Sequence, residues 1–249
     1  MDLNADVGET INDIPCSNDA ILIPLMTSVN IACGGHGGNL ESLSSALALA
    51  KHNNVTVGAH PSYPDRLNFG RRTIDLKQNE LRETITDQLH YLKKLCDQLE
   101  VKISYVKAHG ALYNDMFNES EIADWFLEAI ENFDPNLAIL GQPRGALAKR
   151  ANDRGVRYFQ EGFSDRRYQI DGSLKPRSHE NAVLEKPLEI ATQGYLMASK
   201  RQVTSDSGDQ ISLEVDSICI HGDNPASIDA ARNLRDRLRE AKIPIESFC

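Results

Sequence analysis

Short apolar runs alternate along the chain with longer stretches in which apolar residues recur every three or four positions. The short runs predict β-strands and the longer stretches predict amphipathic helices, as in Leu81, Ile85, Leu89 and Leu92. The predicted strands are Asp2–Val7, Ser28–Cys33, Val55–Ala59, Ser104–Ala108, Ala138–Gly141, Val156–Gly162 and Ser217–Ile220. The predicted helices are Asn18–Met26, Leu40–Lys51, Lys77–Leu99, Glu119–Asn132, Arg144–Arg154, a stretch within Leu188–Lys200, and Ala226–Ala241.

The repeated order of strand and helix predicts an α/β fold with a mostly parallel sheet and helices outside it. The number of strand–helix units favours an irregular, seven-stranded (β/α) barrel over the full eightfold form. No shift in composition marks a linker, so we expect a single barrel domain over residues 1–249. A polar turn at Ser205–Asp209, between two short apolar runs, predicts a small hairpin inserted near residues 201–214.

Four histidines stand at or near the ends of predicted strands, and each is followed at once by Gly or Pro. They are His36, His60, His109 and His221. In α/β folds the carboxyl ends of parallel strands carry the functional side chains, because these ends meet at one side of the sheet. The repeated pattern therefore predicts one shared site rather than separate surface histidines.

Composition and charge narrow the possible partners. The formal net charge of −9 argues against nucleic acid and against an anionic membrane surface. No basic N-terminal segment and no long apolar run is present, so no signal peptide or membrane span is predicted and a cytoplasmic location is expected. The five cysteines show no pairing pattern, which favours a reducing compartment. The sequence agrees with a homo-oligomer as well as with a monomer.

The first predicted strand carries polar residues at alternate positions. A period of two puts Asp2, Asn4 and Asp6 on the same face, and Asp6 lies at the strand end, where a carboxylate is least costly. We therefore expect Asp6 to be catalytic, with Asn4 and Glu9 as second choices. The alternative is that Asp6 only caps the turn that follows.

Lys107 and His109 share one face of another predicted strand by the same period. An ammonium group inside a barrel needs a counter-charge, and Asp6 is the expected partner of Lys107. Together with His60, which precedes an arginine-rich loop, these residues form the predicted catalytic set. Its members are Asp6, His60, Lys107 and His109.

Other segments predict anion binding. The glycine-rich segment Cys33–Asn39 exposes backbone N–H groups around His36, and Asn39 is placed to cap the next helix. Arginines in rigid loops suit carboxylate or phosphate. The candidates for binding substrate or phosphate are Asn4, His36, Arg71, Arg72, Asp165, Arg166, Arg167 and His221. The alternatives are a flexible glycine turn without a ligand, arginines in a solvated basic loop, and a helix cap formed by Asp223 or Asn224.

A metal centre is the rival interpretation of the histidines. His36, His60, His109 and His221 with a carboxylate are chemically able to bind zinc or another transition ion. However, no pair has HxxxH or HExxH spacing, and all of them would have to converge from different strands. The sequence therefore favours a site without a metal ion.

The motifs together resemble the LamB/YcsF family over nearly the whole chain. The matching segments are DLNADVGE at Asp2–Glu9, SVNIACGGHGGN at Ser28–Asn39, VGAHPSYPDRLNFGRR at Val57–Arg72, VKAHGALYND at Val106–Asp115, FSDRRYQIDGSLKPR at Phe163–Arg177 and SICIHGDNP at Ser217–Pro225. Two positions depart from the family pattern. Asn39 stands where the family has Asp, and Ala108 stands where it has Pro.

This resemblance implies a barrel of the glycoside hydrolase/deacetylase type and a cytoplasmic enzyme that cleaves 5-oxoproline to glutamate with hydrolysis of ATP. It also implies two partners, the B and C subunits of the enzyme, and ATP would ordinarily bring Mg²⁺. No GxxxxGK[ST] segment is present, so no P-loop for ATP is predicted. Two alternatives stay open: a metal-dependent hydrolase or deacetylase of a sugar or amide, and a non-catalytic subunit that binds substrate.

Overall fold

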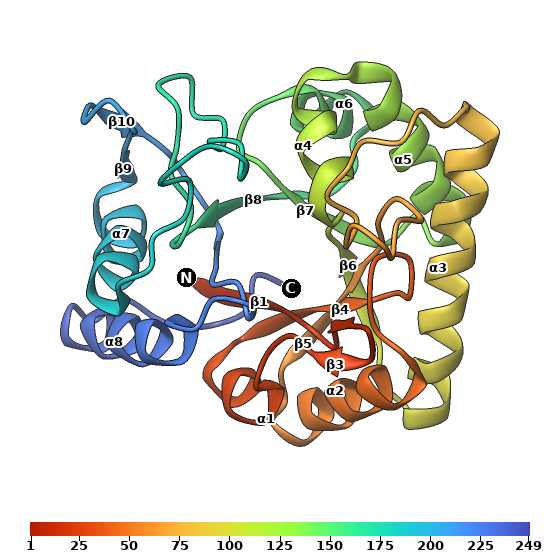
Figure 1. Ribbon diagram of the computed structural model, residues 1–249, viewed down its shortest axis with the longest axis horizontal. Helices are drawn as coiled ribbons and strands as arrows, with labels where there is room; N and C mark the ends of the chain where they lie inside the picture. Colours follow the sequence, from red (N-terminus) through yellow and green to blue (C-terminus); the bar gives the residue numbers. More distant parts are fainter.

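A closed barrel of parallel strands forms the centre of the molecule in the computed structural model, which describes residues 1–249 (Figure 1). The strand order around the barrel is β1-β11-β8-β7-β6-β5-β4. These strands span β1 Asp2–Val7, β4 Ser28–Ala32, β5 Thr56–His60, β6 Ile103–Val106, β7 Ala138–Gly141, β8 Tyr158–Phe163 and β11 Ser217–Cys219. The predicted seven-stranded parallel barrel is therefore confirmed.

Helices surround the barrel, with α7 and α8 packed together on one flank and the long α3 on another (Figure 1). Their bounds are α1 Asp19–Leu22, α2 Leu40–His52, α3 Gln78–Leu99, α4 Gly110–Asn118, α5 Ser120–Phe133, α6 Ala146–Arg154, α7 Pro187–Lys200 and α8 Ser227–Glu240, with a 3-10 turn η1 at Ile23–Leu25. Two small antiparallel pairs complete the fold. They are β2 Thr10–Ile11 with β3 Ile14–Pro15, and β9 Gln202–Thr204 with β10 Gln210–Ser212.

The sequence interpretation did not include α4 or the β2–β3 hairpin. Helix α4 begins at Gly110, directly after His109, and its nine residues are too short a stretch to show a clear helical period, although Ala111, Leu112, Tyr113 and Met116 are buried. Gly110 has a φ of +60°, and a Cβ there would lie 2.3 Å from the carbonyl oxygen of Gly70. This contact fixes the loop after β5 against the start of α4, and Ala111 N donates to Gly70 O at 2.8 Å.

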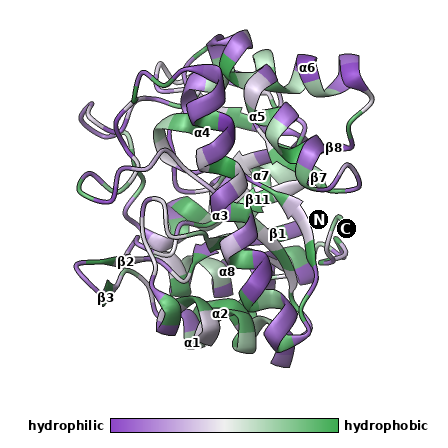
Figure 2. Cartoon of the chain, turned by 90° about the vertical axis from the view of Figure 1, so that its right-hand side faces the viewer, coloured by the Kyte–Doolittle hydropathy of each residue, from purple (hydrophilic) through white to green (hydrophobic).

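The barrel interior is polar, unlike the branched apolar layers of most (β/α) barrels. Asn4 donates to Ser217, and Asn30 donates to both Asn4 and Asp6. The ring of Tyr105 fills the space beside Gly58, where a Cβ would meet it at 2.3 Å. The apolar core lies instead between the barrel and the helices, and Figure 2 shows purple, hydrophilic residues on the outer faces of the helices.

The two ends of the chain close the amino-terminal side of the barrel. The Met1 ammonium group donates to the carbonyl oxygen of Pro244 at 2.7 Å, and Phe248 packs against Tyr105 and Phe159. The opposite, carboxyl-terminal side of the strands is left for the site. No helix of the chain combines the length and the apolar character needed to cross a bilayer.

Asp2, at the closed end of the barrel, should make stability depend on pH. Burial raises the pKa of Asp2 to about 6 from 3.8, although Ser217, Thr27 and Ser28 donate hydrogen bonds to it. Since the folded state holds this proton more tightly, stability falls as the pH rises from about 4 to 6 and then levels off. Over that interval the free energy of unfolding of the wild type should fall by on the order of 2–3 kcal/mol more than that of Asp2→Asn. Urea unfolding of both proteins at pH 4 and pH 7 measures this, and equal pH slopes would contradict it.

Candidate active site

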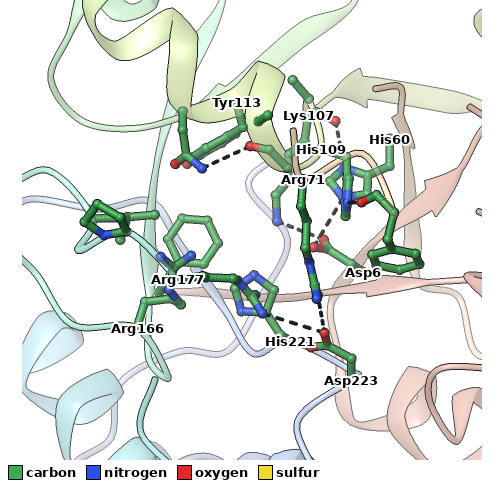
Figure 3. A pocket seen from close by; sticks show the side chains of 18 of the residues that line it. Asp6, His60, Arg71, Lys107, His109, Tyr113, Arg166, Arg177, His221 and Asp223 are labelled. Carbon is green, nitrogen blue, oxygen red and sulfur yellow. Dashed lines mark hydrogen bonds and ion pairs between the residues drawn. The ribbon is translucent and has the colours of Figure 1, made fainter. Parts of the chain in front are cut away.

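A cavity of about 290 Å³ opens at the carboxyl ends of the barrel strands (Figure 3). Every predicted catalytic residue lines it, together with three arginines and His221. Residues from widely separated segments meet here because they lie at or after the carboxyl ends of the parallel strands β1, β5, β6, β8 and β11. The side chains that bear most directly on its chemistry are Asp6, Glu9, His60, Arg71, Lys107, His109, Tyr113, Arg166, Arg177, His221 and Asp223.

Lys107 lies just past the end of β6 and its ammonium group contacts two buried carboxylates. Lys107 Nζ lies 2.8 Å from Asp6 Oδ1 and 2.8 Å from Glu161 Oε1. The expected Lys107–Asp6 ion pair is thus confirmed, with Glu161 as an additional partner. Burial opposes both charges, but the ion pairs hold the pKa of Lys107 well above its usual value. The charges of His60 and Lys107 likewise hold the pKa of Asp6 well below its usual value despite burial.

His60 and His109 meet edge to face beside Asp6, with their ring planes at 89°. His60 Nε2 lies 3.2 Å from Asp6 Oδ2 and 3.0 Å from His109 Nδ1. The remaining nitrogen of each ring points at a backbone carbonyl. His60 Nδ1 lies 2.8 Å from the carbonyl oxygen of Lys107, and His109 Nε2 lies 2.9 Å from that of Phe69. A carbonyl oxygen only accepts, so both of these nitrogens carry hydrogen.

Glu9 and His36 form a second buried pair next to His109. His36 Nε2 lies 2.9 Å from Glu9 Oε1, and its ring stacks on His109 at a centroid distance of 3.6 Å. Burial and the nearby Asp6 charge raise the pKa of Glu9 to about 8. Burial lowers the pKa of His36 to about 3 and, with the neighbouring histidines, takes that of His109 well below its usual value.

Three arginines also line the cavity, with Arg71 beside His109 and the other two further away (Figure 3). Arg71 pairs with Asp223 at 2.5 Å, and Arg177 lies 3.7 Å from the same carboxylate. Arg166 is only 4% exposed and has no carboxylate within 4.0 Å. It donates to the carbonyl oxygen of Lys175 at 2.6 Å, while its Nε has no partner. Burial, with the charge of Arg177, lowers the pKa of Arg166 to about 10.

Some predicted binding residues lie outside the cavity. Asn4 lies below its floor in the barrel interior, and His36 is turned onto Glu9, so the glycine loop does not present it to a ligand. Arg72 points into solvent. Arg167 lines shallow hollows next to Glu189, and Asp165 lies under His221, to whose Nδ1 it is bonded at 2.8 Å. Asn39 caps α2, as expected, by accepting from Ser42 N.

The sequence interpretation gave no functional role to Glu161, Tyr113, Arg177 or Asp223. Glu161 carried a usable signal, since it is a carboxylate inside the apolar run of β8 and shares a face with Phe163. Tyr113 donates to Glu161 at 2.9 Å, which holds this carboxylate toward Lys107. Arg177 and Asp223 lie in loops, where no period indicates which side chains point inward.

The family model for the LamB/YcsF family matches residues 1–249. The chain is 40% identical to a protein of Haemophilus influenzae named as the A subunit of 5-oxoprolinase, over 98% of each chain. It superposes with a TM-score of 0.92 on the crystal structure of a lactam utilization protein from Thermus thermophilus, at 33% identity and with 100% and 99% of the two chains covered. A family 4 carbohydrate esterase from Streptomyces lividans matches with a TM-score of 0.50 at 8% identity, over 100% and 91% of the chains, and shares the fold.

Proposed function

The chain belongs to the LamB/YcsF family, and we propose that it is the catalytic A subunit of a 5-oxoprolinase that hydrolyses ATP. The names of its relatives, the A subunit of 5-oxoprolinase and a lactam utilization protein, support a cyclic amide as the substrate. The cavity of about 290 Å³ suits a small molecule of this kind.

The observation that best supports this proposal is the burial of Arg166 without a carboxylate partner. A buried guanidinium without a carboxylate partner is costly unless a ligand supplies the negative charge. It lines the same cavity as Lys107 and the Asp6–His60 pair. This arrangement supports a substrate with a carboxylate at one end and the reacting group at the other, which describes 5-oxoproline.

The reaction needs the lactam to be activated because a five-membered amide ring is stable near neutral pH. In the proposed sequence the γ-phosphoryl group of ATP passes to the lactam oxygen, which makes the ring carbon electrophilic. Water then bonds to that carbon, the ring C–N bond breaks and the nitrogen takes up a proton, which leaves γ-glutamyl phosphate. A second water hydrolyses this acyl phosphate and releases phosphate. The products are glutamate, ADP and phosphate.

The residues have separate roles in this scheme. The Lys107 ammonium group stabilises negative charge on the lactam oxygen. Asp6 orients the attacking water and accepts its proton, and His60 holds this carboxylate through its contact at 3.2 Å. Arg166 and Arg177 hold the substrate carboxylate, or phosphate, through charge-assisted hydrogen bonds. Mg²⁺ would enter with ATP, and no step above is assigned to it.

We also propose the B and C subunits of the enzyme as partners of this chain. Exposed apolar residues near the mouth of the cavity support docking of a partner at that surface. Ile14 is 69% exposed at the tip of the β2–β3 hairpin, and Leu67 is 99% exposed in the loop after β5. Figure 2 shows this hairpin projecting from the side of the molecule. Both segments follow the carboxyl ends of barrel strands, so a partner bound to them would cover the mouth of the cavity.

The experiment is a glutamate-release assay with 5-oxoproline on this chain assembled with its B and C subunits. We expect one ADP for each glutamate and no glutamate when ATP is omitted. Glutamate release without ATP would remove the nucleotide from the scheme, and no release under any condition would remove the proposed substrate.

A further inference from the structure

We infer that Glu9, His60 and His109 form a binding site for one divalent transition-metal ion at the floor of the cavity. The inference goes beyond the proposed function, and it rests on how the donor atoms of these residues are held. All three residues are at most 6% exposed, and all three line the cavity.

Backbone carbonyl groups orient the two imidazole rings. Histidine ligands of metal ions are oriented in the same way, by a hydrogen bond from the nitrogen that does not bind the ion. His60 Nδ1 and His109 Nε2 donate to carbonyl oxygens at 2.8 and 2.9 Å, so when the rings are neutral, as metal binding requires, the opposite nitrogens hold lone pairs. These are His60 Nε2 and His109 Nδ1, and they face each other at 3.0 Å. Two lone pairs in this position need a cation or a proton between them.

Glu9 supplies the third donor. Glu9 Oε1 lies 3.3 Å from His109 Nδ1, and the donor atoms of Glu9, His60 and His109 all lie within 4.8 Å of one another. Ligands bound to a tetrahedral ion at 2.0–2.1 Å are about 3.3 Å apart, close to the separations of 3.0 and 3.3 Å found here. Two imidazoles and one glutamate also form the ligand set of a catalytic zinc centre whose fourth position stays open.

His36 belongs around this site rather than in it. Its ring lies parallel to that of His109, at an interplanar angle of 4° and a centroid distance of 3.6 Å. Parallel stacked rings cannot both aim an in-plane lone pair at the same ion. His36 Nε2 instead donates to Glu9 Oε1 at 2.9 Å, which orients the carboxylate as an outer hydrogen bond does in many metal sites.

The charges near the site favour a divalent ion. Lys107 lies 2.8 Å from the buried carboxylates of both Asp6 and Glu161, and Glu9 is a third buried acid, which becomes negative when an ion displaces its proton. A divalent cation would balance the remaining negative charge without a further side chain. Because the three ligands line the cavity, the open position of the ion faces the bound substrate, and Asp6 Oδ2 lies 3.2 Å from His60 Nε2 on the same side.

Metal content and Co²⁺ spectra test this without any activity measurement, so the result is independent of the proposed substrate. The full chain, free of affinity tags, is stripped with a chelator and titrated with Zn²⁺ and with Co²⁺. We expect one ion per chain and a Co²⁺ visible absorption typical of a four-coordinate site. His109→Ala and Glu9→Gln should weaken binding at least ~100-fold, and His36→Gln should weaken it about 10- to 100-fold.

His221→Ala is the matched control, because His221 lines the same cavity but pairs with Asp165. It should bind one ion with unchanged affinity. The inference is overturned if the wild type binds neither Zn²⁺ nor Co²⁺ stoichiometrically, or if His221→Ala loses the ion while His109→Ala keeps it. Should a variant fail to fold, the wild-type Co²⁺ titration decides by itself.

Discussion

Replacing Lys107 with methionine should lower the free energy of unfolding by about 3–5 kcal/mol and reduce turnover of the assembled enzyme at least ~100-fold. Lys107 is 2% exposed and is the shared partner of Asp6 and Glu161, each at 2.8 Å. Methionine fills similar space but leaves two buried carboxylates without a counter-charge. Urea unfolding measures the stability, and the glutamate-release assay measures the turnover.

A second variant separates the structural effect of Lys107 from the catalytic one. Lys107→Met combined with Glu161→Gln removes one positive and one negative charge, so the buried net charge returns to its original value. This double variant should recover most of the lost stability but none of the turnover. Lys149→Met, at an exposed position on α6, is the control and should change neither quantity. If the double variant regained turnover, Lys107 would be a structural residue only.

Replacing Arg166 with alanine should raise the KM for 5-oxoproline about 10- to 100-fold, which corresponds to the loss of a charge-assisted hydrogen bond. The KM for ATP should stay close to the wild-type value if Arg166 holds the substrate carboxylate. Because no ion pair of Arg166 is lost, the variant leaves no acid without its partner, and the loss of stability should be limited to the buried side chain and its hydrogen bond to the Lys175 carbonyl oxygen. Steady-state kinetics of the assembled enzyme with each substrate varied in turn measures both constants.

The adjacent arginine gives a matched control for Arg166. Arg167 lies outside the cavity, next to Glu189, so Arg167→Ala should leave the KM for 5-oxoproline unchanged. An increase in both variants would indicate a general effect of positive charge rather than a binding contact. An increase in the KM for ATP alone would assign Arg166 to the nucleotide.

The barrel and the central ion pair could be predicted because their signals are local. Each strand is a short apolar run, and the period of two placed Asp6 and Lys107 inside the barrel, where only an opposite charge makes either tolerable. The same reasoning applied to the run Tyr158–Phe163 would have found Glu161. Strand–helix order was enough to give the architecture, and the shared strand ends were enough to locate the site.

The remaining features depend on contacts between loops, which no sequence period encodes. His36 was expected to hold an anion, but the folding of the glycine loop stacks it on His109 and turns its Nε2 to Glu9. The convergence of Glu9, His60 and His109 was equally hidden, since they come from three different segments and share no motif spacing. Long-range docking, such as that of Gly110 against Gly70, sets these positions.

The most direct test of a catalytic role compares Asp6→Asn with Asp2→Asn in the assembled enzyme. Both changes replace a buried carboxylate by its isosteric amide on the same strand and face, but Asp6 lines the cavity and Asp2 lies at the closed end of the barrel. ATP-dependent glutamate release should fall about 10²–10⁴-fold in Asp6→Asn and stay near the wild-type rate in Asp2→Asn. Full turnover in Asp6→Asn, with assembly intact, would contradict a catalytic role for this chain and leave it a substrate-binding subunit.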